Sequence, residues 1–268
     1  MRRWLRGLLA GLLIAGLVSA LADAAWAHPD DEFCMPGQGG IDPALCQALA
    51  ALDSADGAST LSPAAEELIA DLTSRSPWQT FTLYVWIGVQ HIVPMGLDHI
   101  LFVMALVLST PGLRRLAVQI TAFTAAHSAT LGLAAAGLVA PPLAMVEPLI
   151  AASIAFVALE ALLFRDPPPW RLAVVFGFGL VHGLGFAGAF GELGLPAQQF
   201  WPGLIGFNVG VEIGQIGVAA ATLIALIAAR DLGRGAGKSG RDWIVWPAAI
   251  AISSTGAFWT VERIWSAF

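Results

Sequence analysis

Six imidazole and carboxylate side chains lie within or beside long apolar stretches of this sequence. They are His91, Asp98, His99, His127, His182 and Glu212. An ionisable group that faced lipid would carry a large free-energy cost, so we expect these groups to face the protein interior. Four apolar segments that each direct such a group inward predict one shared site near the middle of a membrane. Nitrogen and carboxylate ligands suit nickel, cobalt, zinc or copper(II), and these segments offer no cysteine for a thiolate site.

The composition indicates an all-α membrane protein. Hydrophobic residues make up 57% of the 268 residues and charged residues 12%, and the mean hydropathy is +0.75. A soluble domain would carry about 25% charged residues. The formal net charge of −6 includes no polybasic run, which argues against nucleic acid as a partner. The expected partners are therefore the lipid bilayer and a divalent metal ion.

Residues 1–27 are predicted to be a signal peptide. Three arginines precede an apolar run over residues 8–21, and Ala25-Trp26-Ala27 fits the small-x-small cleavage pattern. A retained signal anchor is the alternative. Cleavage would place the mature N-terminus outside the cytoplasm.

Residues 28–78 form a predicted exported acidic region with two short helices. Cys34 and Cys46 would lie in an oxidising compartment, so we expect them to form one disulfide. The acidic side chains would either concentrate cations near the membrane or merely keep the segment soluble. His28, at the new N-terminus, could also bind a metal.

Residues 79–268 are predicted to form a domain of six transmembrane helices. The expected spans are approximately 84–109, 116–138, 145–164, 172–191, 203–229 and 243–266. The first of them needs a break, because one helix from Trp78 to Ser109 would be about 48 Å long. Pro94 and Gly96 supply that break. An unwound turn there would line a cavity and could bring His91 and Asp98 to one ion.

The distribution of positive charge predicts the orientation of these helices. The loops assigned to the cytoplasm contain Arg114, Arg115, Arg165, Arg171, Arg230, Arg234, Lys238 and Arg241. The loops assigned to the outside, near Pro141 and over residues 192–202, contain no Lys or Arg. This positive-inside pattern places both mature termini on the external, periplasmic side of a bacterial inner membrane.

Glycine and polar stripes predict how the helices pack. Gly179 and Gly183, and then Gly206, Gly210 and Gly214, form small-xxx-small stripes that allow close helix contact. On the fifth span Asn208, Glu212 and Gln215 form a polar stripe on the opposite side. Both faces of that span would then contact protein. We expect Glu147 to lie near the outer membrane interface, and Glu160 to pair with Arg165 or Arg171.

Four motifs carry a family resemblance. H-I-x-x-x-G-x-D-H-I-L-F, F-T-A-A-H-S-A-T-L, F-G-F-G-L-V-H-G-L-G-F-A and G-F-N-V-G-V-E-I-G-Q occur in that order between about residues 80 and 230. Together they resemble the HupE/UreJ family of membrane proteins, which is associated with hydrogenase and urease systems. The resemblance implies a nickel or cobalt permease in which His91, Asp98, His99 and His182 match family signature positions.

Three alternatives for the function are therefore considered. The first is a permease, not an enzyme, which carries nickel or cobalt as substrate and holds no tightly bound cofactor. The second is an intramembrane hydrolase with a histidine-bound zinc ion, for which Glu212 would be the general base. A non-transporting accessory protein for metallocentre assembly is a third alternative. No nucleotide-binding motif is present, so transport would be passive, driven by membrane potential or coupled to protons. A three-plus-three inverted repeat of the spans is also expected.

Overall fold

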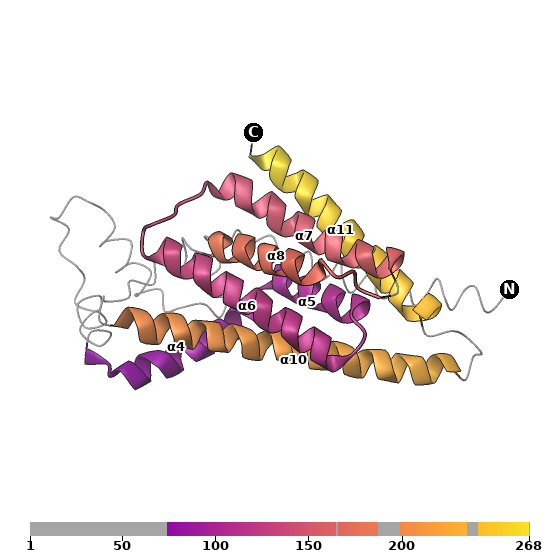
Figure 1. Cartoon of the computed structure of the whole chain (residues 1–268), viewed down its shortest axis with the longest axis horizontal. Coiled ribbons are helices and arrows are strands. Elements are labelled where there is room, and N and C mark those ends of the chain that lie inside the picture. Colours follow the sequence, from indigo (N-terminus) through magenta and orange to yellow (C-terminus); the bar gives the residue numbers. More distant parts are fainter. Residues whose placement is uncertain (1–73, 165, 187–198, 235–240, 268) are drawn as a thin grey trace.

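The computed structural model describes residues 74–164, 166–186, 199–234 and 241–267, and every regular element in this part is a helix. The elements are α4 (Pro77–Ile92), α5 (Leu97–Ser109), α6 (Leu113–Ala135), α7 (Leu143–Leu163), α8 (Arg171–Gly185), α10 (Phe200–Arg234), the short π-helix η2 (Arg241–Val245) and α11 (Trp246–Ser266). They form an elongated bundle (Figure 1). The predicted signal peptide, the Cys34–Cys46 disulfide and His28 lie outside the described residues.

The predicted break in the first span is confirmed. Helix α4 ends at Ile92, α5 begins at Leu97, and the two helices are bent by 72°. Ser76 caps the start of α4, where its hydroxyl accepts a hydrogen bond from the backbone N–H of Gln79. The Gln79 side chain accepts in return from the Ser76 backbone N–H at 2.8 Å. A firmly capped α4 and a separate α5 therefore hold the two histidines of this segment on different helices.

Four of the described helices, α6, α7, α10 and α11, are long and apolar enough to cross a membrane, and the bent α4–α5 pair makes a fifth candidate span. These helices are consistent with a multi-pass membrane protein. The predicted fourth span, residues 172–191, is represented by α8, which has 15 residues. That length corresponds to about 22 Å, less than the roughly 30 Å of a hydrocarbon core. Six spans therefore remain a prediction.

Two helix pairs run parallel, and glycines bring each pair into close contact. Gly206, Gly210 and Gly214 of α10 lie in turn against Phe81, Val85 and Ile92 of α4. Gly179 and Gly183 of α8 lie against Phe123 and His127 of α6 in the same way. A Cβ atom at any of these glycines would collide with the facing helix, in most cases with its backbone. The predicted glycine stripes are thus contact surfaces between helices.

Helices α7 and α11 run antiparallel. Gly256 of α11 faces Ala151 and Ala155 of α7, whereas Arg263, further along α11, donates to the backbone carbonyl of Glu147, earlier in α7. Together with the parallel pairs, this arrangement places the end of α5, the start of α6, the end of α7 and the start of α8 at one end of the bundle. We term it the basic end, because Arg114, Arg115 and Arg171 lie there.

A buried polar cluster joins four helices at the basic end. Arg171 forms an ion pair with Glu160 at 2.8 Å, as the sequence predicted for that glutamate. Its guanidinium also donates to Ser109 Oγ at 2.5 Å and to Gln119 Oε1 at 3.2 Å. We term these four residues, from α5, α6, α7 and α8, the Arg171 cluster.

Candidate metal centre

The four histidines of the described chain converge from four different helices. His91 lies in the last turn of α4, His99 in the first turn of α5, His127 in the middle of α6 and His182 in the last turn of α8. All four are buried. The bend between α4 and α5 brings His91, at the end of α4, close to His99, at the start of α5. The close contact of α6 with α8 places His127 and His182 next to these two rings.

The distances between these rings, which we term the histidine cluster, are short. Ring centroids lie 4.8 Å apart for His91 and His99, 5.8 Å for His99 and His127, and 4.9 Å for His99 and His182. One nitrogen from each of His91, His99 and His127 can be chosen so that all three lie within 4.8 Å of one another. Two imidazole nitrogens on one tetrahedral metal ion would be about 3.4 Å apart. The three nitrogens therefore lie at most about 1.4 Å further apart than in such a site.

Several nitrogens in this cluster lack a hydrogen-bond partner. Both ring nitrogens of His91, Nε2 of His99, Nε2 of His127 and Nδ1 of His182 are buried and unpartnered. Buried polar atoms are nearly always hydrogen-bonded, and leaving one unpaired costs free energy. Five such atoms in one place indicate a site built to be completed by a ligand.

Hydrogen bonds fix how two of the rings present their free nitrogens. His127 Nδ1 lies 3.3 Å from Asn208 Oδ1, an oxygen that can only accept, so this nitrogen carries the proton. The Ser153 hydroxyl donates to the Ile150 carbonyl, so His182 Nε2, at 2.9 Å, donates to Ser153 Oγ. In both rings the other nitrogen is left with its lone pair free. Such partners orient the ring of a metal-ligating histidine.

Aromatic rings and one glycine surround the cluster. Phe186 and Phe207 lie 4.1 Å and 5.3 Å from the His91 ring, measured between centroids, and Phe123 lies 5.0 Å from the His182 ring. A Cβ atom at Gly96 would clash with the His91 carbonyl oxygen and would lie 3.3 Å from His99 Nδ1. Glycine at this position is what lets His99 approach His91 so closely.

Asp98 does not join the histidines. Its carboxylate forms a two-pronged ion pair with Arg263 of α11, at 3.0 Å and 3.2 Å, and both side chains are partly exposed. We expected the break to bring His91 to Asp98; the structure brings His91 to His99 instead, because Asp98 is turned toward α11. Arg263 was not among the predicted site residues, although an arginine within the predicted span 243–266 indicates a carboxylate partner on another helix.

Glu212 also lies apart from the three-histidine group. It is half-buried on α10 and accepts a hydrogen bond of 2.6 Å from the Thr121 hydroxyl of α6. Gln215, which belongs to the same polar stripe of α10, accepts a hydrogen bond of 3.0 Å from the Thr124 hydroxyl of α6. The predicted polar stripe of α10 thus faces α6, and Asn208 is the member that reaches a histidine.

Comparison with known proteins gives one result. A family model described as HupE / UreJ protein matches residues 67–263, which include every described residue named in this site. No curated protein and no solved structure matches the chain. The match covers well over half of the sequence, so the chain belongs to the HupE/UreJ family.

Proposed function

We propose that this protein is a permease for a divalent transition-metal ion, nickel or cobalt, and that His91, His99 and His127 bind the ion during passage. His182 would be the fourth ligand. The observation that supports this proposal is the set of buried, unpartnered nitrogens on four converging imidazoles. The family to which the chain belongs is linked to metal handling, and imidazole is a suitable ligand for nickel and cobalt.

The neutral ligand set is compatible with a transported ion. Imidazoles are neutral ligands, so they leave the double positive charge of the metal uncompensated in a region of low dielectric. A neutral ligand set therefore gives a buried ion less electrostatic stabilisation than the same set with a carboxylate or thiolate in it. Weaker binding allows the release that transport requires.

Asp98 would act beside the cluster rather than inside it. The carboxylate directly precedes His99 in sequence and its side chain is 22% exposed, so it could attract a cation to the histidines. Such a cation would compete with Arg263 for the carboxylate. Glu212 is retained as a further candidate along the path, next to Asn208 on α10.

In this proposal the helices cross a bacterial inner membrane with the basic end in the cytoplasm. The positive-inside rule gives this orientation, and the parallel and antiparallel helix pairs are compatible with six alternating spans. Residues 28–78 and both mature termini would then be periplasmic. A hydrogenase or urease would receive the metal.

A zinc-dependent hydrolase is the second candidate, because three histidines are the protein ligands of some catalytic zinc sites. That reaction needs a general base near the metal. Glu212, the general base first considered, accepts a hydrogen bond from Thr121, and the Asp98 carboxylate is paired with Arg263. The permease therefore accounts for the arrangement better.

Uptake in cells at trace nickel or cobalt, normalised to the amount of protein in the membrane, tests the proposal. His99→Ala and His127→Ala should reduce uptake to the background of cells without the protein, while membrane insertion continues because alanine inserts more easily than histidine. His28→Ala is the matched control. It removes an imidazole outside the cluster and should reduce uptake only slightly, at low metal concentrations.

Metal analysis of the purified protein separates the alternatives. Weak, exchangeable nickel or cobalt that disappears in His99→Ala supports the permease, whereas retained stoichiometric zinc supports the hydrolase. Normal uptake by both His99→Ala and His127→Ala would contradict the shared metal site and favour an accessory protein.

A further inference from the structure

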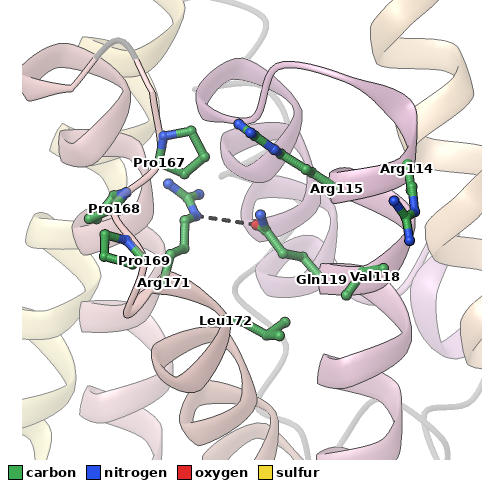
Figure 2. Close-up of a pocket in the computed structure, with 9 residues that line it drawn as sticks. All are labelled: Arg114, Arg115, Val118, Gln119, Pro167, Pro168, Pro169, Arg171 and Leu172. Atoms are coloured by element: carbon green, nitrogen blue, oxygen red, sulfur yellow. Dashed lines mark hydrogen bonds between the residues drawn. The ribbon is translucent and has the colours of Figure 1, made fainter.

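A cavity of about 490 Å³ lies at the basic end, between the start of α6 and the start of α8. It is lined by Arg114, Arg115, Val118, Gln119, Pro167, Pro168, Pro169, Arg171 and Leu172 (Figure 2). Figure 2 shows the Arg115 side chain extended from α6 toward the proline turn. Three consecutive prolines hold that turn in a restricted backbone conformation, so the wall opposite α6 is preformed.

The cavity is positively charged. Three arginines line it, and no acidic side chain does. Arg171 is compensated by Glu160 behind it, but the side chains of Arg114 and Arg115 make no ion pair and no hydrogen bond with any residue in the described part of the chain. Two guanidinium groups are thus available to an anion from outside.

The N-termini of α6 and α8 add to the positive electrostatic potential of the cavity. The residues at the N-cap positions of α6 and α8, Gly112 and Trp170, provide no side-chain hydrogen bond to the first turn. The N-terminus of a helix carries a partial positive charge and free N–H groups, both of which favour phosphate. Here two such ends meet the same cavity; in α8 the N–H groups of Arg171 and Ala173 already donate to the Pro168 and Trp170 carbonyls.

The surroundings of the cavity are apolar. Val118 and Leu172 in its lining are 48% and 43% exposed, and Leu113 beside it is 71% exposed. Both helices continue from here as apolar stretches through the bundle. A ligand that fits this site therefore has an anionic group for the arginines and apolar chains that lie along α6 and α8.

We propose that this cavity binds the phosphate headgroup of an anionic phospholipid from the leaflet at the basic end. The cavity volume is far larger than an inorganic phosphate needs, whereas a glycerophosphate headgroup with the start of its acyl chains would occupy it. Basic pockets between transmembrane helices on the cytoplasmic side are suited to such headgroups. This proposal does not depend on metal transport.

Lipid titration of the purified full-length protein in detergent, followed by native mass spectrometry, tests the assignment. The probes are phosphatidylglycerol, phosphatidylcholine of the same acyl chains, and inorganic phosphate. Wild type should bind phosphatidylglycerol in preference to phosphatidylcholine. Each of Arg114→Gln and Arg115→Gln should weaken that binding about fivefold, and the double variant about 25-fold, since one basic residue near an anionic surface contributes about 1 kcal/mol.

Two matched variants complete the test. Arg75→Gln removes one positive charge at the opposite end of the bundle and should leave lipid binding unchanged. Arg114→Lys with Arg115→Lys preserves the charge and should keep most of the preference. Equal binding of the two lipids by wild type, unchanged binding by the double glutamine variant, or displacement of the lipid by millimolar inorganic phosphate would overturn the proposal.

Discussion

Two polar clusters are buried in the bundle. They share helices α5, α6 and α8, and they differ in how their polar atoms are satisfied. The Arg171 cluster takes Ser109 from α5, Gln119 from α6, Glu160 from α7 and Arg171 from α8. The histidine cluster takes His99 from α5, His127 from α6 and His182 from α8, and Ser153 of α7 is the hydrogen-bond partner of His182. His91 of α4 completes it, and Asn208 of α10 is the hydrogen-bond partner of His127.

In the Arg171 cluster the donors meet acceptors within the protein. The guanidinium contacts a carboxylate, an amide oxygen and a hydroxyl, and Oε1 of Glu160 is the cluster's buried side-chain atom without a partner. In the histidine cluster five ring nitrogens have no partner. The first arrangement leaves one acceptor atom without a partner, and the second leaves five ring nitrogens without one. We infer that the first holds the helices together and that the second serves function.

The largest effect is expected from Arg171→Ala. It would leave the Glu160 carboxylate buried without its cation, and breaking a buried ion pair in this way costs about 3–5 kcal/mol. The free energy of unfolding, measured by denaturation in mixed detergent micelles, should fall by that amount.

The control for this prediction is the double variant Arg171→Leu with Glu160→Leu, which removes both charges together. It should lose much less stability than Arg171→Ala, because an apolar pair leaves no charge uncompensated. If Arg171→Ala were as stable as wild type, the Arg171 cluster would not be what holds the helices together.

An intermediate effect is expected from the two residues that form hydrogen bonds with the histidine rings. Asn208→Ala and Ser153→Ala remove the hydrogen bonds that orient His127 and His182. Loss of such an orienting partner typically weakens metal affinity 10- to 100-fold, so we expect about that loss in nickel or cobalt titrations of the purified protein.

Thr222→Ala and Ser253→Ala are the matched controls. Their hydroxyls donate to carbonyls of their own helices, Val218 and Ile250, away from the histidines. Both should bind metal as wild type does. Equal losses in these controls would mean that general destabilisation, not ring orientation, governs the affinity.

The smallest effect on stability is expected from His91→Leu. Both ring nitrogens of His91 are unpartnered, so leucine removes no hydrogen bond and relieves the cost of burying them. The unfolding free energy of the metal-free protein should change by no more than about 1 kcal/mol, although uptake is lost. A loss comparable to that of Arg171→Ala would place His91 in a structural role.

The sequence by itself determined the class of the protein and the pieces of the site. Hydropathy and charge predicted a helical membrane protein, and Pro94 with Gly96 predicted the break between α4 and α5. The glycine stripes predicted close helix contacts, because small residues permit them at any depth in a membrane. The isolated intramembrane histidines indicated a site, since lipid offers such groups no partner.

Only the tertiary structure decided which of these groups meet. Asp98 and His99 are adjacent in sequence, yet His99 turns to His91 while Asp98 turns to Arg263, 165 residues away. Neighbouring residues on a helix point about 100° apart, so helix packing chooses their separate partners. The pairings of Asn208 with His127 and of Ser153 with His182 likewise depend on which helix faces which. Local pattern identifies polar groups that need a partner, but the packing of helices far apart in sequence supplies it.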